Sequence, residues 1–298
     1  MVQTSRTGGA PRARALISQA RAAASRGRRA LSRRVQGGPL PYLRAILRPR
    51  PRIDASSDVV VSFTSFPARI GGVWAVVDTV FRQDVPLKAV VLVLREQHFP
   101  GQRLPSSLRR RVARGLTILW VEHDQRSYDK LLPARQAFPH DRIITFDDDK
   151  IYARDTASRL IQVSDASPGV IVGSRGIRTV RNGDAIEFAG AVDYGRCAAG
   201  DILSGYSILY PPDSLHPDVF DYLTAVRLCP SGDDVWFWAM SVRHGTERFC
   251  IAAPKHVSLR RQEATPSLSD EYSDGSTQRQ IAAVIDHFDL HKAFRRSG

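Results

Sequence analysis

Runs of apolar, often β-branched residues alternate with helix-like segments between residues 58 and 172. Five of these runs have the length and composition of strands, namely residues 59–64, 89–94, 116–121, 142–146 and 170–172. Between them, Pro67 predicts a non-helical loop at 65–70, and a helix is predicted near 130–138. The run at 89–94 is apolar without a break, which is typical of a strand buried on both faces. Strands that alternate with helices over about 115 residues predict an α/β fold, in which helices flank a doubly wound, mostly parallel sheet.

The second half of the chain is organised differently. Residues 174–270 lose the regular alternation and carry short predicted strands around one helix near 233–243. A last amphipathic helix is predicted near 278–288. We therefore expect one folded domain over residues 53–275, followed by a C-terminal helix within 276–298.

The net charge of +13 comes from one end of the chain. Residues 1–52 hold 13 arginines and no lysine, aspartate or glutamate, so the remaining residues hold 30 basic and 30 acidic side chains. A nucleic-acid-binding domain usually carries its basic face on the folded part. The neutral body of this chain therefore argues against nucleic acid as a partner.

Residues 1–52 are also the segment best suited to a membrane surface. Large apolar residues such as Leu16, Ile17 and Leu31 lie among the arginines at roughly helical spacing, and segments of this kind lie on anionic lipid. A disordered extension and an organelle transit peptide are the alternatives. No stretch has the length of a transmembrane helix, no secretory segment follows Met1, and the three cysteines form no CxxC pair. We expect a cytoplasmic protein that binds peripherally to the inner face of the plasma membrane.

Three consecutive carboxylates, Asp147, Asp148 and Asp149, follow the predicted strand at 142–146. Like charges this close repel one another, and each must be solvated or paired. Mg²⁺ or Mn²⁺ relieves the repulsion because it prefers carboxylate oxygen, and it keeps coordination positions open for phosphate. Acids at the carboxyl end of a strand also lie where α/β sheets bind ligands. The alternative is a solvated acidic turn.

Several segments together resemble one enzyme family. They are residues 59–64 (VVVSFT), 65–70 (SFPARI), 127–131 (SYDKL), 145–152 (TFDDDKIY) and 233–236 (DDVW). In this order they resemble bacterial nucleotide-sugar glycosyltransferases of GT-A fold, family-2-like, of the kind that build capsule, lipopolysaccharide or other envelope polysaccharides. The resemblance covers about residues 57–260. It implies a nucleotide-binding half over 57–173 and an acceptor half over 174–270.

The resemblance implies a DxD metal site, which holds Mn²⁺ or Mg²⁺ against the diphosphate of a UDP- or GDP-sugar. By position, Asp149 is the main metal ligand and Asp147 is a ligand of the metal or the donor. Asp148 then contacts the ribose or the donor sugar, although three adjacent aspartates leave this register open by one residue. His256 follows a short predicted strand where many such enzymes place a third metal ligand or a phosphate contact, with a loop histidine as the alternative. The resemblance also suggests the nearby Lys255, Arg260 and Arg261 as contacts of the diphosphate.

Further residues fall where this family binds the nucleotide and the sugars. Thr64 and Arg69 lie just past the first strand, where the family grips the base and ribose, although Arg69 is equally suited to capping a loop. Lys130 resembles the family lysine that approaches the diphosphate, with a surface lysine at a helix start as the alternative. Tyr206 lies where the family shapes the donor-sugar and acceptor pockets. Trp236 is predicted mainly as a core residue, with stacking on a sugar as the second interpretation.

The pair Asp233-Asp234 opens the helix predicted near 233–243. Aspartate at a helix start ordinarily caps backbone N–H groups. In inverting members of the family, an acid at this point is the general base that takes the proton of the acceptor hydroxyl. The resemblance implies that role for Asp234, with Asp233 in support. The family often has Glu-Asp here, so the departure to Asp-Asp leaves the part of Asp233 open.

The predicted function is metal-dependent transfer of a sugar, of the hexosyl type, from a nucleoside-diphosphate sugar to a glycan or lipid-linked acceptor, with inversion. No GxGxxG follows the first strand and no GxxxxGK[ST] occurs, which disfavours dinucleotide oxidoreductases and P-loop NTPases. A sugar-phosphate nucleotidyltransferase is one alternative, but it normally carries a glycine- and lysine-rich loop where this chain has SFTSFPARIGG. A non-catalytic nucleotide- or sugar-binding module, or an arginine-tail nucleic-acid-binding protein, is the other.

Overall fold

The computed structural model describes residues 51–122, 125–182, 185–252, 254, 256–259 and 275–291. The α-helices are α3 (Pro67–Ile70), α4 (Val73–Val80), α5 (Ser106–Val112), α6 (Leu132–Ala137), α7 (Thr156–Ala166), α8 (Tyr222–Leu228), α9 (Asp233–His244) and α11 (Ser276–Phe288). Short 3₁₀ helices are η1 (Glu96–His98), η2 (Pro100–Gln102), η3 (Arg126–Lys130) and η4 (Pro217–Phe220). The strands are β1 (Val59–Thr64), β2 (Ala89–Arg95), β3 (Leu116–Val121), β4 (Arg142–Phe146), β5 (Lys150–Tyr152), β6 (Ile171–Gly173), β7 (Gly176–Asn182), β8 (Ala185–Ala191), β9 (Gly195–Arg196), β10 (Asp201–Leu203), β11 (Ser207–Tyr210), β12 (Arg248–Cys250) and β13 (His256–Ser258).

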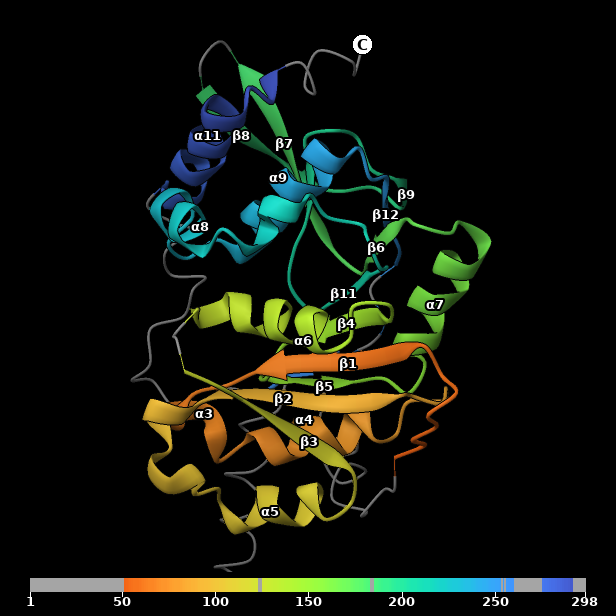
Figure 1. Cartoon of the computed structure of the whole chain (residues 1–298). Helices are drawn as coiled ribbons and strands as arrows, with labels where there is room; N and C mark the ends of the chain where they lie inside the picture. The colour runs from red at the N-terminus through yellow and green to blue at the C-terminus, as the bar shows by residue number, and fades with distance from the viewer. Residues whose placement is uncertain are drawn as a thin grey trace, which may run out of the picture.

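The strands form one large sheet and two small ones. The large sheet has the order β3-β2-β1-β4-β11-β6-β12-β9, and the small ones are β10-β7-β8 and β13-β5. Strands β3, β2, β1 and β4 are parallel, whereas β11 runs antiparallel between β4 and β6. Helices α4 and α5 lie on one side of the parallel strands and α6 lies on the other (Figure 1). This mixed α/β arrangement, a mostly parallel sheet flanked by helices, confirms the predicted fold class.

Both faces of the large sheet are buried. In β1, Val59, Val61 and Phe63 face a core shared with α4 and α5, whereas Val60 faces a second core shared with α6, α9 and α11. Strand β2 divides its residues between the two cores in the same way, so the interpretation of its unbroken apolar sequence is confirmed. Burying each such side chain stabilises the fold by roughly 1.5–3 kcal/mol. The sheet is thus a rigid base for the loops at its ends.

The path of the chain reverses at β1. From β1 the chain continues to β2 and β3 on one side, and it returns to β4 on the other side of β1. Because β1 and β4 are parallel neighbours, their carboxyl ends open side by side. A reversal of this kind in an open α/β sheet is where such folds bind ligands. The fold therefore brings the segments that follow Thr64 and Phe146 to one place.

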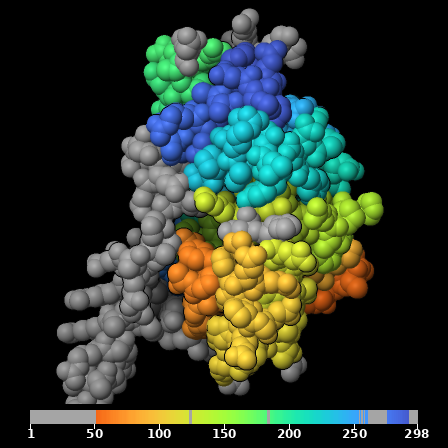
Figure 2. All heavy atoms as spheres, turned by 60° about the vertical axis from the view of Figure 1, so that its left-hand side comes forward, coloured from red at the N-terminus to blue at the C-terminus, as the bar shows by residue number. Residues whose placement is uncertain are grey.

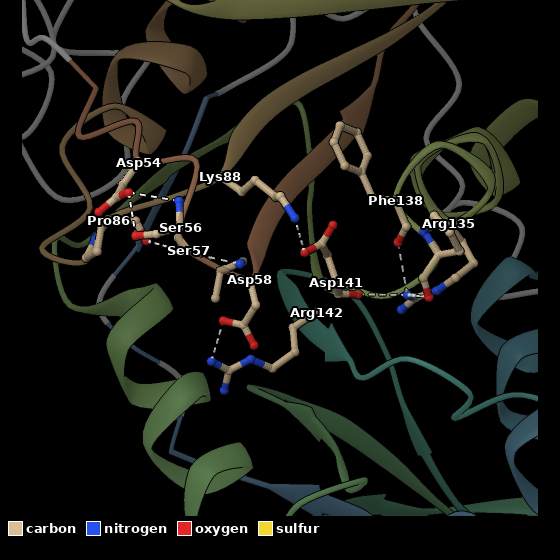
Figure 3. Close-up of polar contacts among 12 residues, drawn as sticks. Asp54, Ser56, Ser57, Asp58, Pro86, Lys88, Arg135, Phe138, Asp141 and Arg142 are labelled. Carbon is tan, nitrogen blue, oxygen red and sulfur yellow. Dashed lines mark hydrogen bonds and ion pairs between the residues drawn. The ribbon is translucent and has the colours of Figure 1, made fainter.

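Ion pairs connect the opposite, amino-terminal edge of the same strands (Figure 3). Lys88 Nζ lies 2.6 Å from Asp141 Oδ1, and Arg142 lies 2.8 Å from Asp58 Oδ1 and 2.5 Å from Asp165 Oδ1. Asp58, Lys88 and Asp141 immediately precede β1, β2 and β4. The ion pairs therefore tie the starts of three strands together, away from the predicted site.

Two segments in the first half differ from the prediction. The sequence predicts a non-helical loop at 65–70, held by Pro67, but the structure has the short helix α3 there. Pro67 lies in the first turn, where its missing N–H is not needed, and Phe66 before it is extended, with φ −140° and ψ 167°. The helix predicted near 130–138 is divided into η3 and α6, because Pro133 in the first turn of α6 cannot donate the hydrogen bond that would continue a helix.

The second half lies above the parallel strands in Figure 1. It contains the sheet β10-β7-β8 and the helices α8, α9 and α11, the last of which confirms the C-terminal helix predicted near 278–288. Among the described residues, no helix combines the length and the apolar character needed to cross a bilayer. Almost all of the predicted tail, residues 1–52, lies outside the described part of the chain, so its boundary stays a prediction.

Candidate functional site

Asp148 joins the end of β4 to the loop after β1. Its Oδ2 accepts a 2.6 Å hydrogen bond from Ser65 Oγ, and its Oδ1 lies 2.6 Å from Arg69 Nη1. The carboxylate is almost fully buried, and burial raises its pKa, although Arg69 and Ser65 act in the opposite direction. In this structure Asp148 therefore holds two loops together, and its predicted contact with ribose or sugar stays a prediction.

The two predicted nucleotide contacts after β1 both have protein partners. Thr64 Oγ1 donates to Val93 O at 3.1 Å on the neighbouring strand β2. Besides its ion pair with Asp148, the Arg69 guanidinium lies 5.2 Å from the ring centre of Phe66, a cation–π distance. Both interpretations of Arg69 thus remain compatible with its position, beside the carboxyl ends of β1 and β4.

Asp149 and His256 are brought to the same side by a small sheet. Asp149 Oδ1 lies 2.6 Å from Lys150 Nζ, and Asp149 O accepts from Leu259 N at 2.8 Å. Strand β13 pairs antiparallel with β5, which places His256 opposite Tyr152 and Ser258 opposite Lys150. His256 therefore lies on the strand next to the one that leaves the three aspartates. The neighbouring residues Lys255, Arg260 and Arg261, which the sequence suggested as diphosphate contacts, lie outside the described residues.

A tight turn at Gly205-Tyr206 connects the three aspartates to the predicted base. Gly205 N donates to Asp234 Oδ2 at 3.0 Å, and the next amide, Tyr206 N, donates to Asp147 Oδ2 at 3.0 Å. Both residues have positive φ, 66° and 52°, a conformation that glycine adopts easily and tyrosine rarely. Two adjacent N–H groups thus hold two carboxylates that are far apart in the sequence. A strained backbone of this kind is often found at functional sites.

Lys130 lies between the two acids that begin α9. Its Nζ is 2.6 Å from Asp233 Oδ2 and 3.2 Å from Asp234 Oδ1, and the residue is only 8% exposed. Burial by itself lowers the pKa of Lys130, but Asp233 and Asp234 outweigh it and raise that pKa well above its ordinary value. Lys130 is therefore a buried, permanently charged ammonium, and the alternative of a surface lysine is wrong.

The surroundings of Asp234 bring the pKa of its carboxyl group close to neutral pH. Burial raises its pKa, Lys130 lowers it, and the repulsion of Asp233 and Asp147 raises it again, so that the pKa is about 6. Burial likewise raises the pKa of Asp147. A raised pKa makes a carboxylate a stronger acceptor for a proton than an ordinary aspartate. Perturbed carboxylates that lie together are typical of functional sites.

Tyr206 forms the exposed side of this arrangement. Its ring centre lies 4.0 Å from that of His256, and Lys150 Nζ lies 5.7 Å from it. The guanidinium of Arg175 lies 5.3 Å from the same ring, and its Nη1 lies 3.3 Å from the Tyr206 hydroxyl. The predicted site residues Tyr206 and His256 are therefore in contact, beside the three aspartates.

Figure 2 shows a hollow on one side of the molecule, between the orange-to-yellow half that carries β1 to β3 and the cyan-to-blue half that carries α8 to α11.

Trp236 is the predicted site residue that the structure does not bring to this place. Its ring is fully buried, and its indole N–H donates to Val219 O at 3.1 Å. Trp238 is also buried and donates to Ala199 O. A ring with no exposed surface cannot stack on a sugar, so the prediction of Trp236 as a core residue is confirmed, and the second interpretation, a contact with substrate, is wrong. The reason is its place on α9, whose residues 235–240 all belong to the second core.

The charges of the site do not balance. Five carboxylates gather here, from Asp147, Asp148, Asp149, Asp233 and Asp234, and three cations are ion-paired with them, from Arg69, Lys130 and Lys150. Within the described residues, no group of three or more His, Cys, Asp or Glu side chains is arranged so that it could hold a metal ion. The surplus of two negative charges and the oxygen-rich donor set nevertheless fit a hard divalent cation such as Mg²⁺ or Mn²⁺.

Three residues of the site were not singled out from the sequence. They are Ser65, which bonds to Asp148, Lys150, which pairs with Asp149, and Arg175, which lies against Tyr206. Ser65 and Lys150 lie inside the motifs that carry the family resemblance, so their positions were a usable signal. Arg175 lies in a short segment between β6 and β7, and only the tertiary fold shows where it points.

No protein-family model matches the sequence, and no curated protein does. Solved structures match over most of the chain. A mannosyltransferase, PcManGT from Pyrobaculum calidifontis in complex with GDP-Man and Mn²⁺, is 16% identical, covers 86% of this chain and 79% of its own, and gives a TM-score of 0.43. S. aureus TarS (1–349) is 10% identical with 80% and 74% coverage and a TM-score of 0.46. Its complex with UDP-GlcNAc is 12% identical with 71% and 60% coverage and a TM-score of 0.47. Similarities this low leave the function to be argued from the site itself.

Proposed function

We propose that the chain is a metal-dependent glycosyltransferase, which moves a sugar from a nucleoside-diphosphate sugar to an acceptor hydroxyl. The observation that carries this proposal is the pair of neighbouring amides that hold Asp147 and Asp234. One of these acids belongs to a cluster suited to a metal and a diphosphate. The other has the pKa of a general base. Transfer from a nucleotide sugar needs both chemistries within a few Å of the same bond.

The oxygen donors for the cation are Asp147 and Asp149, with His256 as the third ligand. All three belong to the same small region, since β13 carries His256 beside β5 and Tyr206 contacts both His256 and Asp147. A bound Mn²⁺ or Mg²⁺ supplies positive charge against the negative charge that develops on the leaving diphosphate. Lys150 and Arg175 add fixed positive charge on the same side, around the ring of Tyr206.

Asp234 is the base, and Lys130 and Gly205 position it. Asp234 takes the proton of the acceptor hydroxyl while the acceptor oxygen bonds to the anomeric carbon and the bond from that carbon to the diphosphate oxygen breaks. The hydrogen bond from Gly205 N fixes one carboxylate oxygen, and Lys130 holds the other. Attack from the side opposite the leaving group inverts the anomeric centre. Asp233 shares Lys130 with Asp234 and supports its orientation.

The donor is a UDP- or GDP-sugar that lies over the carboxyl ends of β1 and β4. In this proposal, Thr64 and Arg69 contact the base and ribose of the donor, and Asp148 holds the loop that carries Arg69. Tyr206 contacts the donor sugar. The acceptor is a glycan or a lipid-linked saccharide of the kind used in envelope polysaccharide synthesis. Attachment to an anionic membrane through residues 1–52 is part of the same proposal, although nearly all of that segment lies outside the described residues.

The test is release of nucleoside diphosphate from a panel of UDP- and GDP-sugars, with Mn²⁺ or Mg²⁺ and with EDTA. The proposal expects one nucleotide class to be turned over or slowly hydrolysed, only with the divalent cation. NMR of the released sugar then reports the anomeric configuration, and a retained configuration would remove the assignment of Asp234 as a base. Absence of turnover and of binding for every nucleotide sugar in the panel would remove the transferase proposal.

A further inference from the structure

A hollow of about 520 Å³ lies beside the start of α9, on the acceptor side of the site. Among the residues that line it are Arg126, Leu228, Ser231, Ser276, Arg279 and Gln280. They come from η3, from the end of α8 and the segment that follows it, and from the first turns of α11. Three elements that are distant in the sequence therefore converge on one concave surface.

The polar lining of this hollow is basic. Arg126 and Arg279 are both exposed, and none of the described residues that line the hollow is acidic. A guanidinium offers five N–H donors in a planar fork that matches the oxygens of phosphate. A phosphate monoester carries close to two negative charges at neutral pH and has three acceptor oxygens. Two arginines on one concave surface are therefore matched in charge and in donors to a phosphate group.

The side chain of Arg126 is tied to the edge of the hollow by a backbone carbonyl, and that of Arg279 lies over the start of α11. Arg126 has a positive φ of 52°, which is rare for a long side chain, and its Nη1 donates to Pro230 O at 3.2 Å across the hollow's edge. The side chain of Arg279 folds back over the start of α11, since its Nη1 lies 3.3 Å from the place that a Cβ would take at Gly275. The two positive charges therefore come from different edges of the hollow, one from η3 and one from α11.

The floor of the hollow is connected to the proposed base. Gln280 is 6% exposed, and its amide bonds to Ser231, with Oε1 accepting from Ser231 N at 3.4 Å and Nε2 donating to Ser231 Oγ at 3.2 Å. Ser231 precedes Asp234 by three residues, so the chain between them spans at most about 11 Å. Arg126 likewise precedes Lys130 by four residues, in the same η3 segment. A group bound in the hollow thus lies within reach of a hydroxyl at Asp234.

We propose that this hollow binds a phosphate group carried by the acceptor, so that the proposed transferase acts on a phosphate-bearing acceptor and not on a neutral saccharide. The proposal rests on the proposed function, because it takes Asp234 as the base that defines the acceptor side. The donor diphosphate is assigned to the metal site at the three aspartates. The hollow is therefore a second phosphate site, in which arginine side chains bind the phosphate in place of a metal ion.

Arginine-selective modification with phenylglyoxal, followed residue by residue by mass spectrometry, tests this on the full-length protein. The probe is inorganic phosphate in the presence of EDTA, which removes metal-dependent binding at the aspartates. Arg110, an exposed arginine on α5, is the internal control. We expect phosphate to slow modification of Arg126 and Arg279 several-fold and to leave Arg110 unchanged. Equal rates with and without phosphate, or the same slowing at all three residues, would overturn the proposal.

Variants separate the hollow from the rest of the site. Arg279→Gln should abolish most of the protection of Arg126 by phosphate, whereas the matched Arg110→Gln should preserve it. Protection by vesicles of an anionic phospholipid without protection by inorganic phosphate would assign the surface to a membrane and overturn the acceptor assignment. Metal-dependent binding of nucleoside diphosphate is measured on the same samples. If it persists while phosphate protects nothing, the hollow proposal fails alone; if it is absent, the proposed function fails, whatever phosphate does.

Discussion

The two ends of the parallel strands are built from the same residue types and differ in how their charges are matched. At the amino end each acid has an ion-pair partner, since Asp141 pairs with Lys88, and Asp58 and Asp165 share Arg142. At the carboxyl end, Asp147 has no ion pair among the described residues and is held by a backbone amide. The amino end is partly exposed, whereas Asp147 and Asp234 are buried enough for their pKa values to rise.

This difference distinguishes charges that stabilise the fold from charges that serve binding or catalysis. Ion pairs at an exposed edge contribute little to stability. Unmatched carboxylates in a buried crevice destabilise the protein, because burial opposes their charge. A sequence that keeps such a cluster at the carboxyl edge retains it for binding or chemistry. Substitutions at the carboxyl edge should therefore change activity strongly, whereas substitutions at the amino edge should leave activity unchanged and alter stability only slightly.

The largest expected effect is on catalysis at the carboxyl edge. Asp234→Asn keeps the shape and the hydrogen bond from Gly205 but cannot take a proton. Transfer should fall by about 10²–10⁴-fold, the usual contribution of a general base, while nucleotide binding is kept. The rate of product formation measures this loss, with the UDP- or GDP-sugar that the panel described under the proposed function selects. Asp58→Asn at the amino edge is the matched control, and equal losses in the two variants would show that the comparison of edges is wrong.

The next effect is on stability at the same edge. Lys130→Met removes the cation that lies between Asp233 and Asp234 and leaves two buried carboxylates without it. Breaking a buried ion pair in this way destabilises by about 3–5 kcal/mol, measured by urea unfolding at neutral pH. Because Lys130 lowers the pKa of Asp234, that pKa should also rise in the variant. A variant as stable as the wild type would mean that Lys130 is not the partner of these acids.

The pH dependence of transfer should report Asp234 directly. Its pKa is raised to about 6, so the carboxylate becomes protonated as the pH falls through 6 and can no longer act as a base. Activity should be level above that point and fall roughly tenfold per pH unit below it. An aspartate with its ordinary pKa would keep full activity at pH 5, and that result would contradict the assignment. In Lys130→Met the midpoint should move upward.

The smallest effect is expected at the amino edge. The two partners of Arg142, Asp58 and Asp165, have side chains that are 56% and 62% exposed. Arg142→Ala should therefore lower the free energy of unfolding by at most about 1 kcal/mol, with transfer unchanged. Thermal unfolding at low and high salt measures it, and any difference from wild type should shrink at high salt. A loss of several kcal/mol in the free energy of unfolding would show that these exposed ion pairs stabilise the fold strongly, against this account.

The sequence predicts the sheet well because its signals are local. Unbroken apolar runs and the order of strands and helices determine which segments form the two cores, and the three aspartates after a strand fall at its carboxyl end. The turn at Gly205-Tyr206 could not be predicted, because its two amides find Asp147 and Asp234 only after β11 has inserted beside β4. The sequence left a sugar contact of Trp236 open for a similar reason: an aromatic residue beside functional acids has the same sequence signal whether it faces a sugar or the core.

The central claim is that the surplus carboxylates at the carboxyl edge bind a divalent cation together with a nucleoside diphosphate. The most direct test is the thermal midpoint of unfolding with UDP, GDP, CDP or dTDP, each with and without Mn²⁺, for wild type, Asp149→Asn and the amino-edge control Asp58→Asn. A ligand at about 100 times its Kd should raise the midpoint by about 5–10 °C. The account predicts this rise for one nucleotide only with Mn²⁺, kept in Asp58→Asn and lost in Asp149→Asn. A rise that does not need the cation, or that survives in Asp149→Asn, would contradict it.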